Sequence, residues 1–190
     1  MSQSYFEDLT IEKMVFTEKP LAQGFYEGCT FSGCDFANAD ISDTNFTDCA
    51  FKDCNLSLAK IVKTTFNHVH FTGCKMLGLH FDECSKMIFS VQFTSCVLNL
   101  SSFFRLNMKK TTFSSCSLHE VDFTETDLAG ASFDDCDLAG AIFDGTNIEK
   151  ADFRKAINYT LDPDKNKVKK ARFAVAGLAG LLGKHNLDIH

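Results

Sequence analysis

Cysteine and histidine are the side chains of this 190-residue sequence best suited to metal binding or nucleophilic chemistry. The chain contains Cys29, Cys34, Cys49, Cys54, Cys74, Cys84, Cys96, Cys116, Cys136, His68, His70, His80, His119, His185 and His190. Zinc sites usually combine two closely spaced cysteines with a second such pair or with histidines. Here most neighbouring cysteines are five or twenty residues apart, and no histidine lies in a recognisable metal motif. We therefore predict no metal site and no cofactor.

The sequence also lacks the patterns of common catalytic sites. It has no glycine-rich phosphate-binding loop, no nucleophile elbow and no Ser/His/Asp context. We predict that the protein is not an enzyme, and we name no catalytic residue.

Apolar residues recur every five positions along most of the chain. From Phe6 to Phe81, all sixteen residues at this spacing are apolar. The pattern fails at Lys86, resumes two residues later at Ile88, and continues through fourteen positions to Phe153. A period of five belongs neither to an α-helix nor to a β-strand. It predicts a repeat architecture.

Small side chains occupy the position two residues before the apolar centre of many units. All nine cysteines lie at this position, with Cys84 counted in the register that precedes the break. Cysteine packs as a small hydrophobe. We therefore interpret the cysteines as core residues, and expect free thiols because reducing conditions disfavour disulfides between stacked cysteines.

Units such as Ala131-Ser-Phe-Asp-Asp and Ala141-Ile-Phe-Asp-Gly resemble the A-(D/N)-(L/F)-x-x unit of the pentapeptide-repeat family. The resemblance extends from Phe6 to Phe153. It implies an all-β fold, a right-handed quadrilateral parallel β-helix with four units per coil. The central and minus-two side chains would point inward. We predict this β-helix over residues 1–153.

The sequence tests the four-unit coil, because every fourth unit should share a face. One face then has the central residues Phe31, Phe51, Phe71, Phe93, Phe113, Phe133 and Phe153. The next face carries, at its minus-two position, Cys34, Cys54, Cys74, Cys96, Cys116 and Cys136. The spacing is 20 residues, except for 22 across the break. The two extra residues are therefore predicted to form a small bulge near Ser85–Met87 at one corner.

Residues 154–190 are predicted to form a loop (Arg154–Lys167), a last partial coil and a C-terminal capping or dimerisation segment. The apolar stretch 174–183 is expected to be a short helix, in which Gly177 and Gly180 lower helix propensity but allow close packing. A terminal strand is expected at 187–189.

The tail has two possible roles. It closes the open end of a monomer, or it forms the two-fold dimer interface that the resemblance implies, because several topoisomerase-protecting members end in a similar segment. We favour the homodimer. The residues predicted to form the dimer or the cap are Val175, Leu178, Leu181, Leu182 and Ile189.

The chain has a formal net charge of −6, which disfavours direct nucleic-acid binding. Nine acidic and no basic residues lie between Thr111 and Glu149. This charge serves solubility, which any repeat rod needs, or it forms an acidic partner-binding face. The residues predicted for such a face are Glu120, Asp122, Glu125, Asp134, Asp135, Asp137 and Asp144.

The resemblance to the quinolone-resistance and microcin-immunity branch implies a DNA-mimicking protein that binds a type II topoisomerase, DNA gyrase or topoisomerase IV. It would modulate the enzyme or protect it from drugs or toxins. The alternative is a general protein-interaction scaffold without a topoisomerase role. No signal peptide or membrane-spanning stretch is visible, so we expect a cytoplasmic protein without membrane contact.

Overall fold

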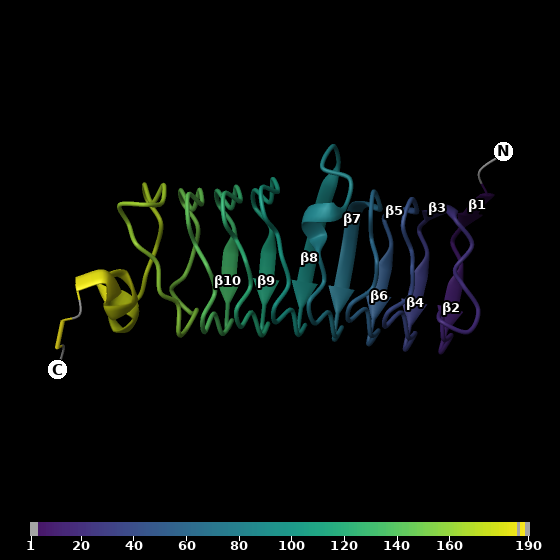
Figure 1. The fold of residues 1–190 in the computed structure, drawn as a ribbon, viewed down its shortest axis with the longest axis horizontal. Coiled ribbons are helices and arrows are strands. Elements are labelled where there is room, and N and C mark those ends of the chain that lie inside the picture. Colours follow the sequence, from purple (N-terminus) through teal and green to yellow (C-terminus); the bar gives the residue numbers. More distant parts are fainter. Residues whose placement is uncertain (1–3, 186, 189–190) are drawn as a thin grey trace.

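The computed structural model describes residues 4–185 and 187–188. The chain winds into a right-handed, four-sided β-solenoid whose coils lie side by side along a rod, with the N-terminus and the C-terminus at opposite ends (Figure 1). All pairing is parallel, and the described strands form one ten-stranded sheet. The strands are β1 (Ser4–Glu7), β2 (Thr10–Glu12), β3 (Gly24–Glu27), β4 (Thr30–Ser32), β5 (Asn45–Thr47), β6 (Ala50–Lys52), β7 (Thr65–Thr72), β8 (Phe89–Thr94), β9 (Thr112–Ser114) and β10 (Ser132–Asp134).

The pairing register confirms the 20-residue coil. Phe31 pairs with Phe51, Phe51 with Phe71, and Phe71 with Phe93 across the insertion. Isolated bridges at the same spacing continue the other sides of the rod, as from Asp122 to Ile142.

We number the faces by their central residues. Face 1 includes Phe46, Phe66, Phe89, Met108, Leu128, Ile148 and Val168; face 2, Phe31, Phe51, Phe71, Phe93, Phe113, Phe133, Phe153 and Phe173; face 3, Phe36, Leu56, Met76, Leu98, Leu118 and Leu138; face 4, Ile41, Ile61, Phe81, Phe103, Phe123 and Phe143.

Stacked phenylalanine rings fill the inside of the rod. The predicted column of seven on face 2 is confirmed, with ring centroids 4.6 to 5.4 Å apart from coil to coil. A second column, which the sequence analysis did not identify, runs along face 4 from Phe81 through Phe103 and Phe123 to Phe143 at 4.7 to 5.4 Å. Rings of the two columns meet edge to face, an arrangement that aromatic quadrupoles favour.

Each regular corner is formed by a left-handed residue two positions after a central residue. Asp53 (φ 51°), Lys63 (φ 57°) and Leu100 (φ 63°) are examples. This conformation is uncommon for residues other than glycine, but it is fixed here by hydrogen bonds between coils. The N–H of Asp53, for instance, donates to the carbonyl of Thr72 at 2.8 Å. The corner side chains are mostly exposed, so the corners carry much of the surface charge.

The insertion lies where it was predicted, but its register differs from the prediction. Ile88, expected as a central residue, is half-exposed, and Phe89 takes the central position, with its ring 6.4 Å from that of Phe66 and 5.9 Å from that of Phe81. Three residues are inserted before this centre, and the β7–β8 register shift removes one after it. The net insertion of two residues keeps the faces of successive coils aligned. A larger ring thereby fills the core.

The insertion also changes the shape of the rod locally. It follows a one-turn 3₁₀ helix, η1 (Phe81–Glu83), and rises above the neighbouring coils (Figure 1). Met87 at this loop is 94% exposed.

The last coil continues further than expected. In the stretch predicted as a loop, Ile157 still bridges to Asp137 and Lys167 to Asn147. Two 3₁₀ helices follow, η2 (Val175–Leu181) and η3 (Gly183–His185), where one short helix was expected. Leu187 and Asp188 form no strand, and Ile189 lies outside the described residues.

The helix η2 packs on the end of the rod, and its glycines allow this close contact. A Cβ at Gly177 would come within 2.0 Å of the Tyr159 hydroxyl, and one at Gly180 within 2.1 Å of the Tyr159 carbonyl oxygen. The N–H of Leu161 donates to the Gly180 carbonyl at 3.0 Å. The predicted role of these glycines in close packing is confirmed.

Candidate interaction surface

The cysteines lie in the core, as predicted. All nine are buried and free. Within the column, the Cys54 thiol donates to the Phe31 carbonyl at 3.5 Å and the Cys74 thiol to the Phe51 carbonyl at 3.3 Å. Burial raises the pKa of Cys49 and of Cys84 to about 12. These thiols therefore fill space and satisfy backbone carbonyls.

We expect the native cysteines to be almost inert to an aromatic disulfide reagent at about pH 8, because the reactive thiolate forms only after unfolding. All nine should react once the chain is unfolded in guanidinium. Thr94→Cys, on an exposed outward position, is the control and should react stoichiometrically in the folded protein. Rapid reaction of any native cysteine in the parent would contradict this account. The absorbance of the aromatic thiolate released by the reagent gives the number of cysteines that have reacted.

Three histidines each contact one carboxylate on the surface. His68, His80 and His119 lie 3.5, 3.3 and 2.9 Å from Asp48, Asp82 and Asp137. Within residues 4–185 and 187–188, no three His, Cys, Asp or Glu side chains are grouped as metal ligands would be.

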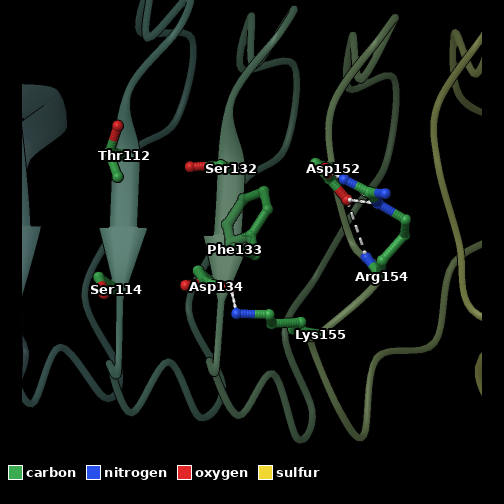
Figure 2. A pocket seen from close by; sticks show the side chains of 8 residues that line it. All are labelled: Thr112, Ser114, Ser132, Phe133, Asp134, Asp152, Arg154 and Lys155. Carbon is green, nitrogen blue, oxygen red and sulfur yellow. Dashed lines mark hydrogen bonds and ion pairs between the residues drawn. The ribbon is translucent and has the colours of Figure 1, made fainter.

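A shallow hollow of about 430 Å³ lies on face 2 near the C-terminal end, and the sequence analysis did not identify it (Figure 2). Its charged side chains already have partners. Arg154 holds Asp152 at 2.6 Å and lowers the pKa of that carboxyl to about 2, while Lys155 lies 2.9 Å from Asp134. Hydroxyl groups complete the lining, from Thr112, Ser114 and Ser132. No hydrogen bond links these hydroxyl groups to the carboxylates of the lining.

The predicted acidic residues do not all lie on one face. Asp122 and Asp144 flank the central residues of face 4, Glu120 lies at the corner between faces 3 and 4, and Glu125 lies at the corner between faces 4 and 1. We call these four residues the acidic side. The other three lie elsewhere: Asp134 on face 2, Asp135 at the corner between faces 2 and 3, and Asp137 on face 3.

Basic residues from neighbouring coils neutralise part of this charge. Arg105 binds Glu125 through two hydrogen bonds of 2.6 and 2.9 Å, which lower the pKa of Glu125. Asp134 is paired with Lys155, and the His119 imidazole lies 2.9 Å from Asp137. These partners are 18 to 21 positions away in sequence, so a count along the chain does not find them.

Three carboxylates of the acidic side lack a direct ion-pair partner, although Lys165 and Lys184 line the same hollow as Asp144. Among the described residues, Glu120, Asp122 and Asp144 form no ion pair. Asp122 accepts a hydrogen bond from the Thr124 N–H at 2.8 Å, which fixes its orientation. Glu120 and Asp144 are exposed. They form a rigid, negatively charged strip across two adjacent coils.

The predicted tail residues are largely exposed. Val175 is 86% exposed, and Leu178 and Leu182 are also exposed, whereas Leu181 packs partly against the core. Leu187 adds another exposed apolar side chain. The C-terminal end of the rod therefore presents an apolar surface to solvent.

Comparisons with known proteins agree with this architecture. Two solved structures of QnrB1, described as a plasmid-mediated fluoroquinolone resistance protein, share the fold. A trypsin-treated variant has a TM-score of 0.58 at 21% identity, covering 98% of this chain and 92% of that one. The full-length form has a TM-score of 0.55 at 17% identity, covering 97% and 100%. A search of curated protein sequences gave no match.

Within the described part of the chain, no helix has the length and apolar character needed to cross a membrane. The family model described as a pentapeptide repeat region matches residues 26–86 and 86–157, well over half of the chain. This match agrees with the five-residue period and the four-sided coil. The chain belongs to the pentapeptide repeat family.

Proposed function

We propose that the protein is a non-enzymatic, DNA-mimicking binder of a type II topoisomerase, DNA gyrase or topoisomerase IV, and that it modulates the enzyme or protects it from drugs or toxins. The observation that carries the proposal is the strip of Glu120, Asp122 and Asp144, which form no ion pair among the described residues and are held on stacked coils. The likeness in fold to QnrB1, a fluoroquinolone resistance protein, supports it.

The acidic side acts through its field and its rigidity. Coils stack at about 4.8 Å, so carboxylates on adjacent coils are held at fixed separations. Duplex DNA carries one negative charge per about 1.7 Å of its axis. The acidic side is less densely charged and spans two adjacent coils, so it imitates the sign of the phosphate charge and its presentation on a rod. A DNA-binding groove lined by Lys and Arg would attract it through electrostatic complementarity.

A supercoiling assay with gyrase, and a decatenation assay with topoisomerase IV, test the proposal when run with and without a quinolone. At micromolar protein we expect inhibition of the enzyme or relief of its inhibition by the drug. If the purified protein does neither with either enzyme, the proposal fails and the general interaction scaffold remains.

We propose further that the exposed tail forms a homodimer through the C-terminal ends of two rods. Leu178→Asp with Leu182→Asp is expected to change the protein from dimer to monomer, because it places two charges in an apolar contact. Leu58→Asp with Leu100→Asp is the control, since both leucines are exposed at corners remote from the tail. Light scattering measures the molar mass of the parent and of each variant in solution. A parent that is already monomeric at micromolar concentration contradicts the dimer.

A further inference from the structure

A second charged surface lies at the corner between faces 1 and 2 in the last two coils, so face 1 lies between this corner and the acidic side. We call it the basic corner, formed by Lys150, Lys167, Lys169, Lys170 and Arg172. Lys150 and Lys170 are both left-handed corner residues (φ 61° each), and the N–H of Lys150 donates to the Lys169 carbonyl at 3.0 Å. The backbone therefore fixes the position from which each of these two lysine side chains extends.

The positive charge of the basic corner is largely uncompensated. Among the described residues, its four lysines form no ion pair, and Arg172 lies 3.7 Å from Asp152, which Arg154 already binds at 2.6 Å. All five side chains are exposed. Residues 150–172 contain eight basic and three acidic residues, a net of +5, although the whole chain is at −6. The charge of the rod is thus segregated.

We propose that the basic corner binds the phosphate backbone of duplex DNA. Lysine presents a point charge on a flexible stem, which suits phosphate contacts that carry no sequence information. Lys167 and Lys169 lie on the same side of one segment, about 7 Å apart. The preceding coil adds Lys150, which lies about 4.8 Å along the rod from Lys170. The result is a grid of ammonium groups on a rigid support.

A protein partner fits this surface less well. Strong protein–protein interfaces are centred on aromatic or other large apolar anchors that become buried. Between Ile157 and Val175, no large apolar side chain is exposed. The basic corner therefore offers charge without an apolar centre, as backbone contacts with a nucleic acid require.

The overall negative charge of the chain does not oppose this binding. Of the strip, Glu120 lies at the corner diagonally opposite Lys150 and Lys170, and Asp144 is separated from that corner by the width of face 1. Interactions between exposed charges are largely screened beyond about 10 Å at 0.1 M salt. Glu149 on face 1 and Asp152 on face 2 are the carboxylates nearby, and they leave a local positive excess. The net charge of −6, from which we expected no nucleic-acid contact, averages over two surfaces of opposite sign.

Fluorescence anisotropy of a labelled duplex of about 30 base pairs, with no topoisomerase present, tests the proposal. With about four phosphates neutralised, the binding constant should fall about 100-fold between 50 and 200 mM salt. The basic-corner variant, Lys150→Gln, Lys167→Gln, Lys169→Gln and Lys170→Gln, should lose at least about tenfold in affinity at 50 mM salt and show a shallower salt dependence.

A matched control has the same change in net charge elsewhere on the rod: Lys13→Gln, Lys52→Gln, Lys63→Gln and Lys75→Gln. These lysines are exposed and form no ion pair within the described part of the chain, and Lys13 and Lys63 are left-handed corner residues, as Lys150 and Lys170 are. The control should bind DNA as the parent does, with circular dichroism confirming that both variants fold. The proposal is overturned if the parent does not bind the duplex at 50 mM salt, or if the control loses as much affinity. Polyglutamate serves as an acidic polypeptide for comparison. The proposal is also overturned if the parent binds polyglutamate through the basic corner but does not bind the duplex.

Discussion

Replacing Phe113 by alanine is expected to lower the free energy of unfolding by about 3–5 kcal/mol. Phe113 is fully buried in the face 2 column, where its ring stacks on Phe93 at 5.2 Å and on Phe133 at 5.0 Å. It also meets Phe103 and Phe123 edge to face. Rigid coils above and below limit collapse into the space left behind, so the variant loses both apolar burial and ring contacts. Urea unfolding followed by circular dichroism measures the change.

Phe104→Ala provides the control, because Phe104 points outward beside Phe103 and has its ring 4.6 Å from the Arg105 guanidinium. Its loss should cost at most about 1 kcal/mol. Equal effects of the two substitutions would show that the ring column does not dominate the stability of the rod. Because a solenoid is stabilised by nearest-neighbour contacts, the Phe113 variant is also expected to unfold less cooperatively.

The acidic-side variant, Glu120→Lys, Asp122→Asn and Asp144→Lys, is expected to lower the rate of association with the topoisomerase by about 10- to 1000-fold. Lysine already occupies the left-handed corner position elsewhere, as at Lys150, so Glu120→Lys should be tolerated. Asparagine at position 122 keeps an oxygen that accepts the Thr124 N–H. The variant therefore changes charge with little change in backbone. Surface plasmon resonance at several salt concentrations gives the rates.

The matched control is Asp53→Lys, Asp35→Asn and Glu7→Lys, which makes the same charge change in the N-terminal half. Asp53 is a left-handed corner residue, and Asp35 accepts the Ala37 N–H at 2.9 Å in the same type of turn as Asp122. If the control slows association as much as the acidic-side variant, net charge explains the attraction and the acidic side has no special part in it.

The sequence predicted the core well because a solenoid repeats one local rule. Phe31 and Phe113 lie four coils apart, yet each is placed by its own five-residue unit and by the coil beneath it. At the insertion this rule fails. Ile88 and Phe89 are both apolar, so hydrophobic pattern alone cannot choose between them; the choice depends on which side chain fills the space between Phe66 and Phe81.

The surface was harder to predict because charge in a four-sided coil is distributed over four directions. Asp134 and Asp144 are ten residues apart in sequence but lie on opposite faces, whereas Arg105 and Glu125 are twenty apart and are in contact. Acidic residues that are consecutive along the chain therefore form no single surface. The same geometry gathers Lys150 with Lys169 and Lys170 at one corner, although the net charge of the chain suggested no cationic surface.

Competition with DNA for the topoisomerase tests whether the protein binds the enzyme as a DNA mimic. A labelled duplex is bound to gyrase or topoisomerase IV, and the basic-corner variant is added so that this protein does not itself hold the duplex. The duplex should be displaced completely as the protein is added, because both ligands occupy the same cationic groove. The claim is contradicted if the protein binds the enzyme and leaves the duplex in place, or if it does not bind the enzyme at all.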